Sequence, residues 1–433
     1  MNYIVKNTYL LTIENLSKDA TGQASCGNKL FSVHGALPGE LVRVKTFRKK
    51  LNTYQASLMN ILRQSTVRVN PHCLHFNICS GCNLQHMPYG FQLNFKLNSL
   101  KNLIKEAALD FDRAISVIKE EQVGYRLKAR LAMKWVTKKE KVVIGFRERG
   151  SGYITDSSTC SVLHERLQKI VFKLPALVEQ TSVKNAAPQI EVVTDERIVA
   201  IILRHLKPLT SDDLTKLLAF CQEFEVDIYL QNGGPETVSK IGEVTQMYYE
   251  VAGCQLKFSP NSFIQVNRDI NNRMVNIVLE EMNLNPEDCV IDFFCGLGNF
   301  SIPLAKHAKK VLGIEFDSDM VKLANENAAN NKCRNATFIK SDLYKSEIGL
   351  DSICLSDYNK IILDPPRSGA AVLISQLNLE AASLLIYVSC NASTLMNDAK
   401  ILICKYGYEI SNVFLLDMFP QTIHFETIMV FKK

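Results

Sequence analysis

The sequence has no long hydrophobic run and no targeting segment. No stretch of its 433 residues reaches the roughly 18 consecutive apolar residues that suggest a membrane span. The first residues, Met1 to Leu11, lack the basic region and the small-residue cleavage site of a secretory signal. Internal repeats and low-complexity segments are also absent. We therefore expect a globular cytoplasmic protein with two or three domains.

Cysteine, in contrast, is plentiful, with 13 residues scattered over all regions of the chain. An odd number of cysteines in a large chain without an export signal is typical of reduced thiols. We therefore expect a subset of them to serve in metal binding or catalysis.

Charge is distributed unevenly along the chain. Residues 1–160 carry 24 Lys and Arg against 11 Asp and Glu, a balance of +13. The rest of the chain carries 26 against 33, a balance of −7. This asymmetry indicates a polyanion-binding module in front of a catalytic one. The alternative is a solvated basic face that has no partner.

Residues 1–64 alternate short apolar strands with glycine turns, which predicts a small antiparallel, OB-like β-barrel. Between Val42 and Lys45 apolar and basic residues alternate, and the chain continues into Arg48 and Lys49. This pattern places a row of cations on the outer face, where they suit RNA phosphates. The expected strands are Tyr3–Val5, Tyr9–Ile13, Leu30–Val33, Glu40–Phe47 and Thr53–Ile61.

Residues 65–262 are predicted to form an α+β middle domain that binds RNA. Arg126, Lys128 and Arg130 alternate along one strand and are candidate phosphate contacts. The segment 93–124 is expected to pack on the domain that follows. The expected elements are a helix from Phe91 to about Asp110, strands Lys128–Val136, Val142–Phe146, Ile190–Val193 and Ile198–Arg204, and a helix over Ser211–Glu223.

Residues 263–433 alternate helices with buried apolar strands, which predicts a doubly wound, Rossmann-like α/β domain. Its first strand begins at Cys289, and a Gly-x-Gly turn at Gly296 and Gly298 leads into a helix over 301–309. Glycines at this place let the backbone approach a ligand closely.

Acidic residues at the ends of the next strands strengthen the cofactor hypothesis. Glu315 ends the strand 310–315, 19 residues after Gly296, where an acid accepts both ribose hydroxyls of an adenosine. Asp342 follows the strand 336–340 and is a candidate for contacting the adenine amino group.

Two adenosine cofactors compete for this site. A nicotinamide dinucleotide would favour a third glycine, but position 301 is Ser, and no Gly-Lys-Ser/Thr phosphate loop is present. S-adenosylmethionine has no phosphate and needs no such loop, so it fits better. A Rossmann-like fold without a cofactor is the remaining alternative.

The strand 360–363 ends in Asp364, Pro365, Pro366 and Arg367. Asp-Pro-Pro here resembles the substrate loop of methyltransferases that act on amino groups, but those enzymes follow it with an aromatic residue. Arg367 therefore argues against N-methylation. Asp364 is placed to contact a uracil edge or the cofactor.

Cys390 ends the strand that begins at Leu384, in the crevice expected for the cofactor. A thiolate that adds to carbon 6 of uracil makes carbon 5 nucleophilic enough to attack a methyl sulfonium. A base must then remove the carbon-5 proton, and Glu426 is the candidate, with His424 as its rival. A buried structural cysteine is the alternative reading of Cys390.

A cysteine cluster lies between Pro71 and Gly90. Cys73, Cys79 and Cys82 fall within ten residues, and the distant Cys160 completes a four-thiolate set. Four soft ligands suit zinc or an iron–sulfur cluster. Radical chemistry is less favoured, since it uses three cysteines. Nearby His72, His75 and His86 are expected to be loop or RNA-contact residues.

Taken together, several motifs resemble the bacterial RNA 5-methyluridine methyltransferase family, nearest to its large-ribosomal-subunit member. Pro366, where some members carry alanine, is a departure that touches no expected role. The family's transfer-RNA enzyme lacks both the barrel and the cysteine cluster. The matching stretches are Phe258–Asn267, Asp292–Phe300, Leu363–Gly369, Val388–Thr394 and Leu416–Thr427, with Ile202–His205 and Pro208–Asp213 pointing to the ribosomal member.

This resemblance implies carbon-5 methylation of a uridine in 23S ribosomal RNA, with S-adenosylmethionine as donor, by a monomer. It identifies residues 1–64 as a TRAM domain, Cys390 as nucleophile and Glu426 as general base. Methylation of another or a second RNA site, and an inactive RNA-binding or assembly protein, are the alternatives. The implied cofactor contacts are Gln265, Phe294, Asn299, Glu315, Asp342 and Asp364, and the implied ligands of a 4Fe–4S cluster are Cys73, Cys79, Cys82 and Cys160.

Overall fold

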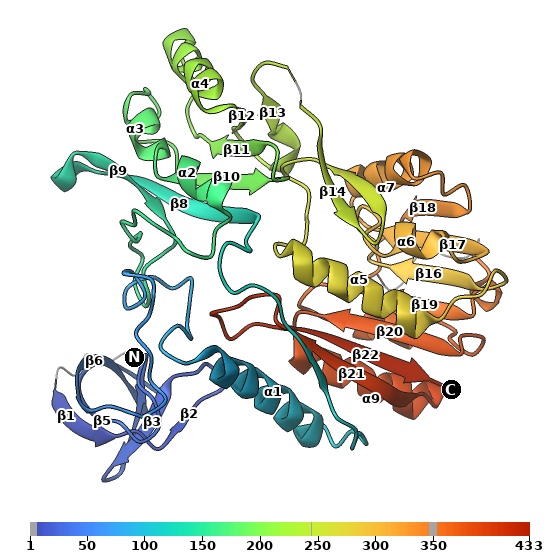
Figure 1. Cartoon of the computed structure of the whole chain (residues 1–433), viewed down its shortest axis with the longest axis horizontal. Coiled ribbons are helices and arrows are strands. Elements are labelled where there is room, and N and C mark those ends of the chain that lie inside the picture. Colours follow the sequence, from blue (N-terminus) through green and yellow to red (C-terminus); the bar gives the residue numbers. More distant parts are fainter. Residues whose placement is uncertain (1–6, 244, 346–352) are drawn as a thin grey trace. The chain divides into compact units, whose positions relative to one another are not determined.

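The computed structural model describes residues 7–243, 245–345 and 353–433. The chain divides into two compact units, and the sheet formed by β1 to β6 in Figure 1 belongs to the first. Within the described ranges, no helix has the length and apolar character needed to cross a bilayer. The first unit is Met1–Ser99, Phe146–Thr155 and Gln421–Ile423, and the second is Leu100–Gly145, Asp156–Pro420 and His424–Lys433.

Six strands form the sheet of the first unit, in the order β1-β5-β6-β4-β3-β2. Neighbouring strands are antiparallel except β4 and β6, which are parallel, so the expectation of a wholly antiparallel barrel is wrong at this pair. The reason is that residues 34–40 connect β4 to β5, but β5 does not pair with β4. Because β6 runs antiparallel to β5 and lies beside β4, it pairs with β4 in parallel. The strands are β1 (Thr8–Thr12), β2 (Asn15–Leu16), β3 (Gly22–Cys26), β4 (Lys29–Val33), β5 (Leu41–Lys50) and β6 (Thr53–Arg63).

Alternation along β5 builds the core of this sheet. Val42 and Val44 are fully buried, whereas Arg43 and Lys45 between them are exposed, as the pattern predicted. The strand expected at Tyr3–Val5 lies outside the described residues. The core also contains Leu11, Ile13, Ala24, Phe31, Val33, Ala36 and Ala56.

The second unit begins with a middle sheet in the order β13-β12-β11-β10-β8-β9. The expected strands are present, and most of their ends are shifted by one residue. The reason is that apolar alternation predicts the buried part of a strand but not the residue at which its pairing stops. Its elements are β8 (Lys128–Val136), η1 (Thr137–Lys139), β9 (Lys141–Gly145), α2 (Glu165–Val171), α3 (Leu174–Glu179), β10 (Gln189–Thr194), β11 (Val199–Arg204), α4 (Ser211–Phe224), β12 (Val226–Gln231), η2 (Pro235–Thr237) and β13 (Ser239–Lys240), followed by the hairpin β14 (Met247–Val251) and β15 (Cys254–Phe258).

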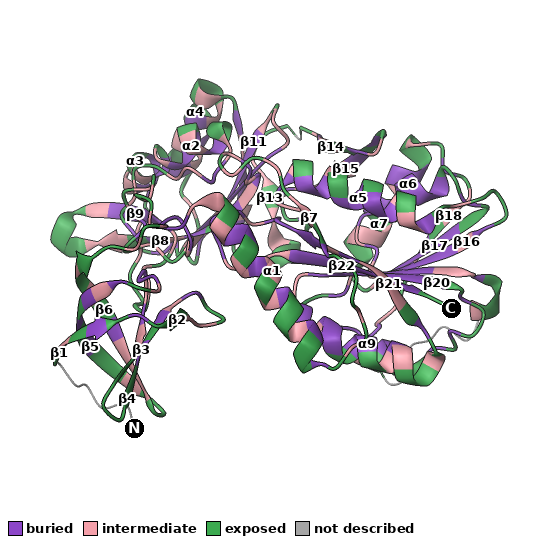
Figure 2. Cartoon of the chain, turned by 60° about the horizontal axis from the view of Figure 1, so that its bottom comes forward, coloured by how far each residue is buried: buried purple, intermediate pink, exposed green. Residues whose placement is uncertain are grey.

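An eight-stranded sheet follows, in the order β18-β17-β16-β19-β20-β22-β21-β7. Figure 2 shows its central strands buried. Its elements are β7 (Ser116–Ile118), α5 (Arg268–Met282), β16 (Cys289–Phe293), α6 (Ser301–Ala305), β17 (Lys310–Glu315), α7 (Ser318–Asn330), β18 (Ala336–Lys340), η3 (Leu355–Asp357), β19 (Lys360–Leu363), α8 (Ala371–Gln376), β20 (Leu384–Ser389), α9 (Ala392–Tyr406), β21 (Glu409–Leu416) and β22 (Glu426–Lys432).

The strand order of this sheet creates a crevice at its centre. The chain runs outward from β16 to β18, then returns to the other side of β16 with β19 and β20, all of them parallel. Ligands bind at such a switch point, beyond the carboxyl ends of the strands. β7 joins the far edge in parallel with β21, from within segment 93–124. The helix α1 (Tyr89–Glu106) precedes it.

Candidate active site

Cys390 and Glu426 lie at adjoining ends of two hydrogen-bonded strands. β20 and β22 are antiparallel, and their last pair is Ser389 with Thr427. Extending this register by one residue sets Cys390 opposite Glu426, on the same face of the sheet. Glu426 is buried and Cys390 is partly exposed. The carboxyl group is thus enclosed, while the thiol remains accessible.

The electrostatic surroundings link these two residues to the loop after β19. Burial raises the pKa of Cys390 to about 11, and the charges of Glu426 and Asp364 add to this effect. The charge of Arg367 and a hydrogen bond from it act in the opposite direction. Burial also raises the pKa of Glu426 well above its usual value. The structure therefore brings Cys390, Glu426, Asp364 and Arg367 together.

The loop that carries Arg367 is held by the start of α9. Arg367 O accepts hydrogen bonds from Asn391 Nδ2 at 2.9 Å and from Thr394 Oγ1 at 3.3 Å. Ala370 N donates to the buried Asp398 Oδ2 at 2.6 Å. At Gly369, with φ of +80°, a Cβ would lie 2.8 Å from that oxygen, so glycine permits the close approach.

The expected cofactor turn follows β16. Phe294 has a φ of +66°, a strained value for an aromatic residue that is often associated with functional sites. Gly296 N donates to Glu315 Oε2 at 3.1 Å, which draws the turn toward the end of β17. Glu315 Oε1 accepts from Phe316 N at 2.7 Å and Asp317 N at 2.9 Å. The acid is thus fixed at the mouth of the crevice.

Two further carboxyl groups are desolvated in this crevice. Burial raises the pKa of Asp292 to about 8, and the charges of Asp364 and Glu315 contribute. Burial raises the pKa of Asp364 to about 7. The Asp292 side chain is fully buried, and its Oδ2 accepts a hydrogen bond from Ser301 Oγ. A site with so many desolvated acids favours a cationic ligand.

Asn299 lies in the same turn, and Gln265 lies in the segment before α5. Gln265 lines a cavity of about 350 Å³ that Tyr249 and Asn271 also line. Asn299 Oδ1 accepts from Tyr249 Oη at 3.0 Å and from Asn271 Nδ2 at 2.9 Å. The cavity therefore borders the residues that fix Asn299.

Two side chains in the crevice, those of Phe316 and Tyr344, were not predicted. Phe316, 62% exposed, directly follows Glu315 and offers an apolar surface beside it. Tyr344 follows Asp342 by two residues, and its N–H donates to Asp342 Oδ1 at 3.1 Å. An aromatic residue directly after a strand-end acid is a sequence signal that could have identified Phe316. Tyr344 is recognisable only once the loops are placed in space.

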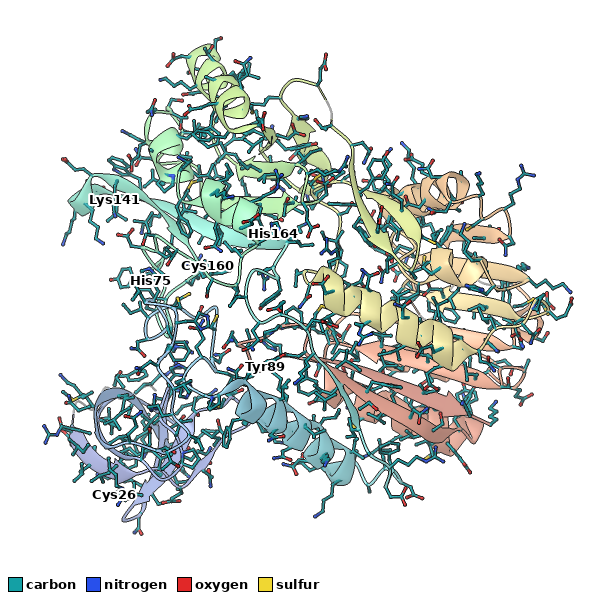
Figure 3. The ribbon with its side chains drawn as sticks, viewed as in Figure 1. Cys26, His75, Tyr89, Lys141, Cys160 and His164 are labelled. Atoms are coloured by element: carbon teal, nitrogen blue, oxygen red, sulfur yellow. The ribbon has the colours of Figure 1, made fainter. Side chains whose placement is uncertain are left out.

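The cysteine loop of the first unit is built around Arg149. Its guanidinium donates to Cys79 O at 2.8 Å and to Cys82 O at 2.7 Å, and Gly81 N donates to Cys79 Sγ at 3.3 Å. Cys160, labelled in Figure 3, belongs to the second unit. In the described part of the chain, no three His, Cys, Asp or Glu side chains gather in a metal-binding group.

One of the predicted RNA contacts has a structural role instead. Lys128 Nζ donates to Pro260 O at 2.8 Å and Ser262 O at 2.7 Å, and burial lowers its pKa to about 8. Arg130 remains exposed and pairs with Glu191 at 2.8 Å. His86, expected as a loop or RNA-contact residue, is fully buried. Alternation along a strand does not reveal a neighbouring loop that captures one of the cations.

Comparison with known proteins adds independent findings. A family model described as tRNA (Uracil-5-)-methyltransferase matches residues 88–433. The 23S rRNA (uracil(1939)-C(5))-methyltransferase RlmD of Vesicomyosocius okutanii is 40% identical over 430 residues, covering 98% of each chain. The RlmD of Francisella tularensis strain SCHU S4 is 36% identical over 441 residues, covering 100% of this chain and 98% of that one.

A solved structure shares the fold. The tRNA (uracil-54, C5)-methyltransferase of Pyrococcus abyssi, solved with S-adenosyl-L-homocysteine, superposes with a TM-score of 0.77. The match covers 98% of this chain and 99% of that one at 23% sequence identity. The chain therefore shares its fold with that solved structure along nearly its full length.

Proposed function

The chain belongs to the tRNA (uracil-5-)-methyltransferase family, and we propose that it methylates carbon 5 of a uridine in 23S ribosomal RNA. The single observation that carries the chemistry is the register of β20 and β22, which sets a thiol opposite a buried carboxyl group. A ribosomal RNA substrate would make the enzyme cytoplasmic, and a monomer remains our prediction.

We assign the nucleophile to Cys390. Its sulfur adds to carbon 6 of the uracil ring, which forms a carbon–sulfur bond and moves electron density to carbon 5 and oxygen 4. Arg367 hydrogen-bonds the thiol in the free enzyme and favours its ionised form. Because burial keeps the thiol protonated at neutral pH, its proton must pass to solvent before the sulfur adds to the ring, and Arg367 stabilises the thiolate that forms.

We assign the general base to Glu426. S-adenosylmethionine, when bound, supplies a methyl group on a positively charged sulfur. Carbon 5 of the adduct would take this methyl group, with S-adenosyl-L-homocysteine as the leaving group, and Glu426 would then remove the carbon-5 proton so that the ring double bond re-forms and the cysteine sulfur leaves. His424 is exposed and packs at 6.3 Å from Phe419, ring centre to ring centre. Glu426 is the better candidate because its carboxyl group faces the thiol.

The cofactor contacts in this proposal are Gln265, Phe294, Asn299, Glu315, Asp342 and Asp364. Support comes from the position of Glu315, Asp342 and Asp364 at or just after the ends of strands beside one switch point, and from the desolvated acids, which favour a cationic ligand. Phe316 adds an exposed ring beside Glu315, suited to an adenine face. The relative from Pyrococcus abyssi was solved with the corresponding product, S-adenosyl-L-homocysteine.

We also propose that Cys73, Cys79, Cys82 and Cys160 hold a 4Fe–4S cluster. Buried polar atoms without a hydrogen-bond partner lie beside the cysteine loop, among them Arg149 Nε. A buried cation with an unsatisfied donor fits an anionic neighbour, as a thiolate-bound cluster would be. Such a cluster would serve to shape the loop, and the reaction steps above do not use it.

We assign RNA recognition to residues 1–64, which we propose to form a TRAM barrel, and to the middle domain, residues 65–262. The methyltransferase domain is proposed to comprise residues 263–433. The exposed cations of β5 support the first assignment. The overall fold does not choose between RNAs, because a tRNA enzyme matches the chain from end to end. Identity of 36–40% to 23S rRNA enzymes favours the ribosomal substrate.

The test is to incubate the purified protein and S-adenosylmethionine with a 23S rRNA fragment and with tRNA, and to map 5-methyluridine. We expect methylation of one uridine in the ribosomal fragment, abolished in Cys390→Ala, which should still bind RNA. Methylation of tRNA alone would overturn the substrate assignment. Full activity of Cys390→Ala would overturn the mechanism, and RNA binding without any methylation would point to an assembly protein.

A further inference from the structure

Tyr344 contacts both the cofactor side of the crevice and the loop that carries Arg367. Its ring centre lies 5.7 Å from that of Phe294, at a tilt of 48°. Its hydroxyl lies 2.9 Å from Ser368 Oγ and donates to Gly369 O at 2.9 Å. The side chain is 42% exposed, so it forms part of the crevice surface.

The same loop is held from its opposite side by α9. Arg367 O accepts from Asn391 and Thr394, and Ala370 N donates to Asp398, which also accepts from Tyr387 Oη at 2.5 Å. The loop is therefore fixed on the nucleophile side by contacts with α9, of which those of Asp398 are buried. On the cofactor side, it is fixed by the hydroxyl of a partly exposed tyrosine.

We propose that Tyr344 is a positioning residue that couples occupancy of the cofactor site to the placement of Arg367 beside Cys390. A ligand that packs against Phe294 restricts the motion of the neighbouring Tyr344 ring. The hydroxyl of Tyr344 then restricts the motion of Ser368 and Gly369, which it contacts through hydrogen bonds. Arg367 immediately precedes these two residues, and its guanidinium hydrogen-bonds the thiol. The inference rests on the proposed function, since Cys390 and Phe294 take their roles from it.

The coupling has a measurable consequence for thiol addition alone. When S-adenosyl-L-homocysteine fills the site, no methyl group can be transferred. The sulfur can still add to carbon 6, carbon 5 can take up a solvent proton, and loss of the original carbon-5 hydrogen followed by release of the thiolate regenerates the uracil. Release of tritium from RNA labelled at carbon 5 of uridine therefore reports addition without methylation.

The experiment measures tritium release with and without S-adenosyl-L-homocysteine in the wild type, Tyr344→Phe and Tyr406→Phe. Tyr406 is a matched control, because its hydroxyl donates to Ile374 O at 2.6 Å and to Leu377 O at 2.7 Å, at the far end of α8. We expect the homocysteine compound to accelerate release in the wild type and in Tyr406→Phe. In Tyr344→Phe the loaded rate should fall at least about fivefold, because the variant loses the contacts of the hydroxyl with Ser368 and Gly369 and one hydrogen bond is worth about that factor.

Binding of the homocysteine compound separates positioning from simple ligand contact. Tyr344→Phe keeps the ring against Phe294 and loses only the link to the loop, so its affinity should fall by no more than its loaded rate falls, whereas Tyr344→Leu should bind more weakly still. The proposal is overturned if the wild type shows no acceleration, if Tyr344→Phe retains it in full, or if Tyr344→Phe loses as much affinity as Tyr344→Leu. Equal tritium release by Cys390→Ala and wild type would instead overturn the proposed function.

Discussion

Cys390 faces Glu426 one residue beyond the last hydrogen-bonded pair of β20 and β22, Ser389 with Thr427. An antiparallel pairing aligns the two side chains on one face, at the separation of a cross-strand pair. In the proposed mechanism, a pyrimidine ring that enters at this edge meets the sulfur and the carboxyl group together. The two groups come from segments 36 residues apart in the sequence, which only the sheet brings into contact.

Glu426→Gln should trap the covalent RNA adduct. Addition and methyl transfer do not require the carboxylate, but proton removal from carbon 5 does, so turnover should fall by roughly 10²–10⁴-fold. Denaturing gel electrophoresis of the protein with RNA measures the trapped species. His424→Gln serves as the matched variant and should turn over normally. Adduct accumulation in His424→Gln in place of Glu426→Gln would move the base to His424.

The pH at which Cys390 becomes reactive should follow its charged neighbours. Burial raises the pKa of the thiol to about 11, with Glu426 and Asp364 adding to the effect and Arg367 opposing it. Glu426→Gln removes a negative charge, so alkylation by iodoacetamide should begin at lower pH, and in Arg367→Gln at higher pH. Mass spectrometry of the Cys390 peptide measures this, with exposed Cys404 as internal reference. A shift in the reverse direction for either variant would contradict the assignment.

Affinity for S-adenosylmethionine should rise with pH. Burial raises the pKa of Asp364 to about 7, so below that pH the group is neutral and offers no charge to a cation. Binding should therefore tighten between about pH 6 and about pH 8 and release protons, by thermodynamic linkage. Calorimetry in two buffers of different ionisation enthalpy measures the release. S-adenosyl-L-homocysteine, which lacks the sulfonium charge, should show a weaker dependence, and Asp364→Asn should flatten it.

Neutralising the outer cations of β5 should weaken RNA binding. Arg43 and Lys45 are exposed on one face of the sheet, and Arg48 continues the row. Each lost phosphate contact should reduce the slope of log affinity against log salt by about 0.7 to 0.9. Filter binding of Arg43→Gln/Lys45→Gln/Arg48→Gln at several salt concentrations measures this. Lys309→Gln, which removes an exposed cation paired with Glu287 at 2.8 Å, is the control and should leave the slope unchanged.

Removing any one proposed cluster ligand should remove iron. Protein purified without oxygen should be brown and contain iron and sulfide, whereas Cys79→Ser and Cys160→Ser should be nearly colourless. Cys26→Ser changes an exposed cysteine of the small sheet and should keep the full iron content. Elemental analysis and the visible absorption spectrum measure the result. A colourless wild type that holds zinc would contradict the iron–sulfur assignment.

The sequence was enough to predict the five parallel strands of the eight-stranded sheet and the acids at their ends, whereas β7 and β21 were not predicted. β17, β18 and β19 have the predicted bounds, because a buried strand between polar turns is a local pattern. The sequence did not predict the parallel pairing of β4 with β6 or the hydrogen bonds of Lys128. Both depend on which distant segment lies alongside, and a one-dimensional pattern of apolar and charged residues carries no record of that.

Sequence alone determined the residue types available for the chemistry, namely a thiol, several strand-end acids and an arginine after Asp-Pro-Pro. The tertiary structure decided that Cys390 meets Glu426, that Tyr344 bridges Phe294 and Gly369, and that burial raises the pKa values of Asp292 and Asp364. Desolvation and contact are properties of packed neighbours, and those neighbours are chosen by the register and order of the strands in the sheet.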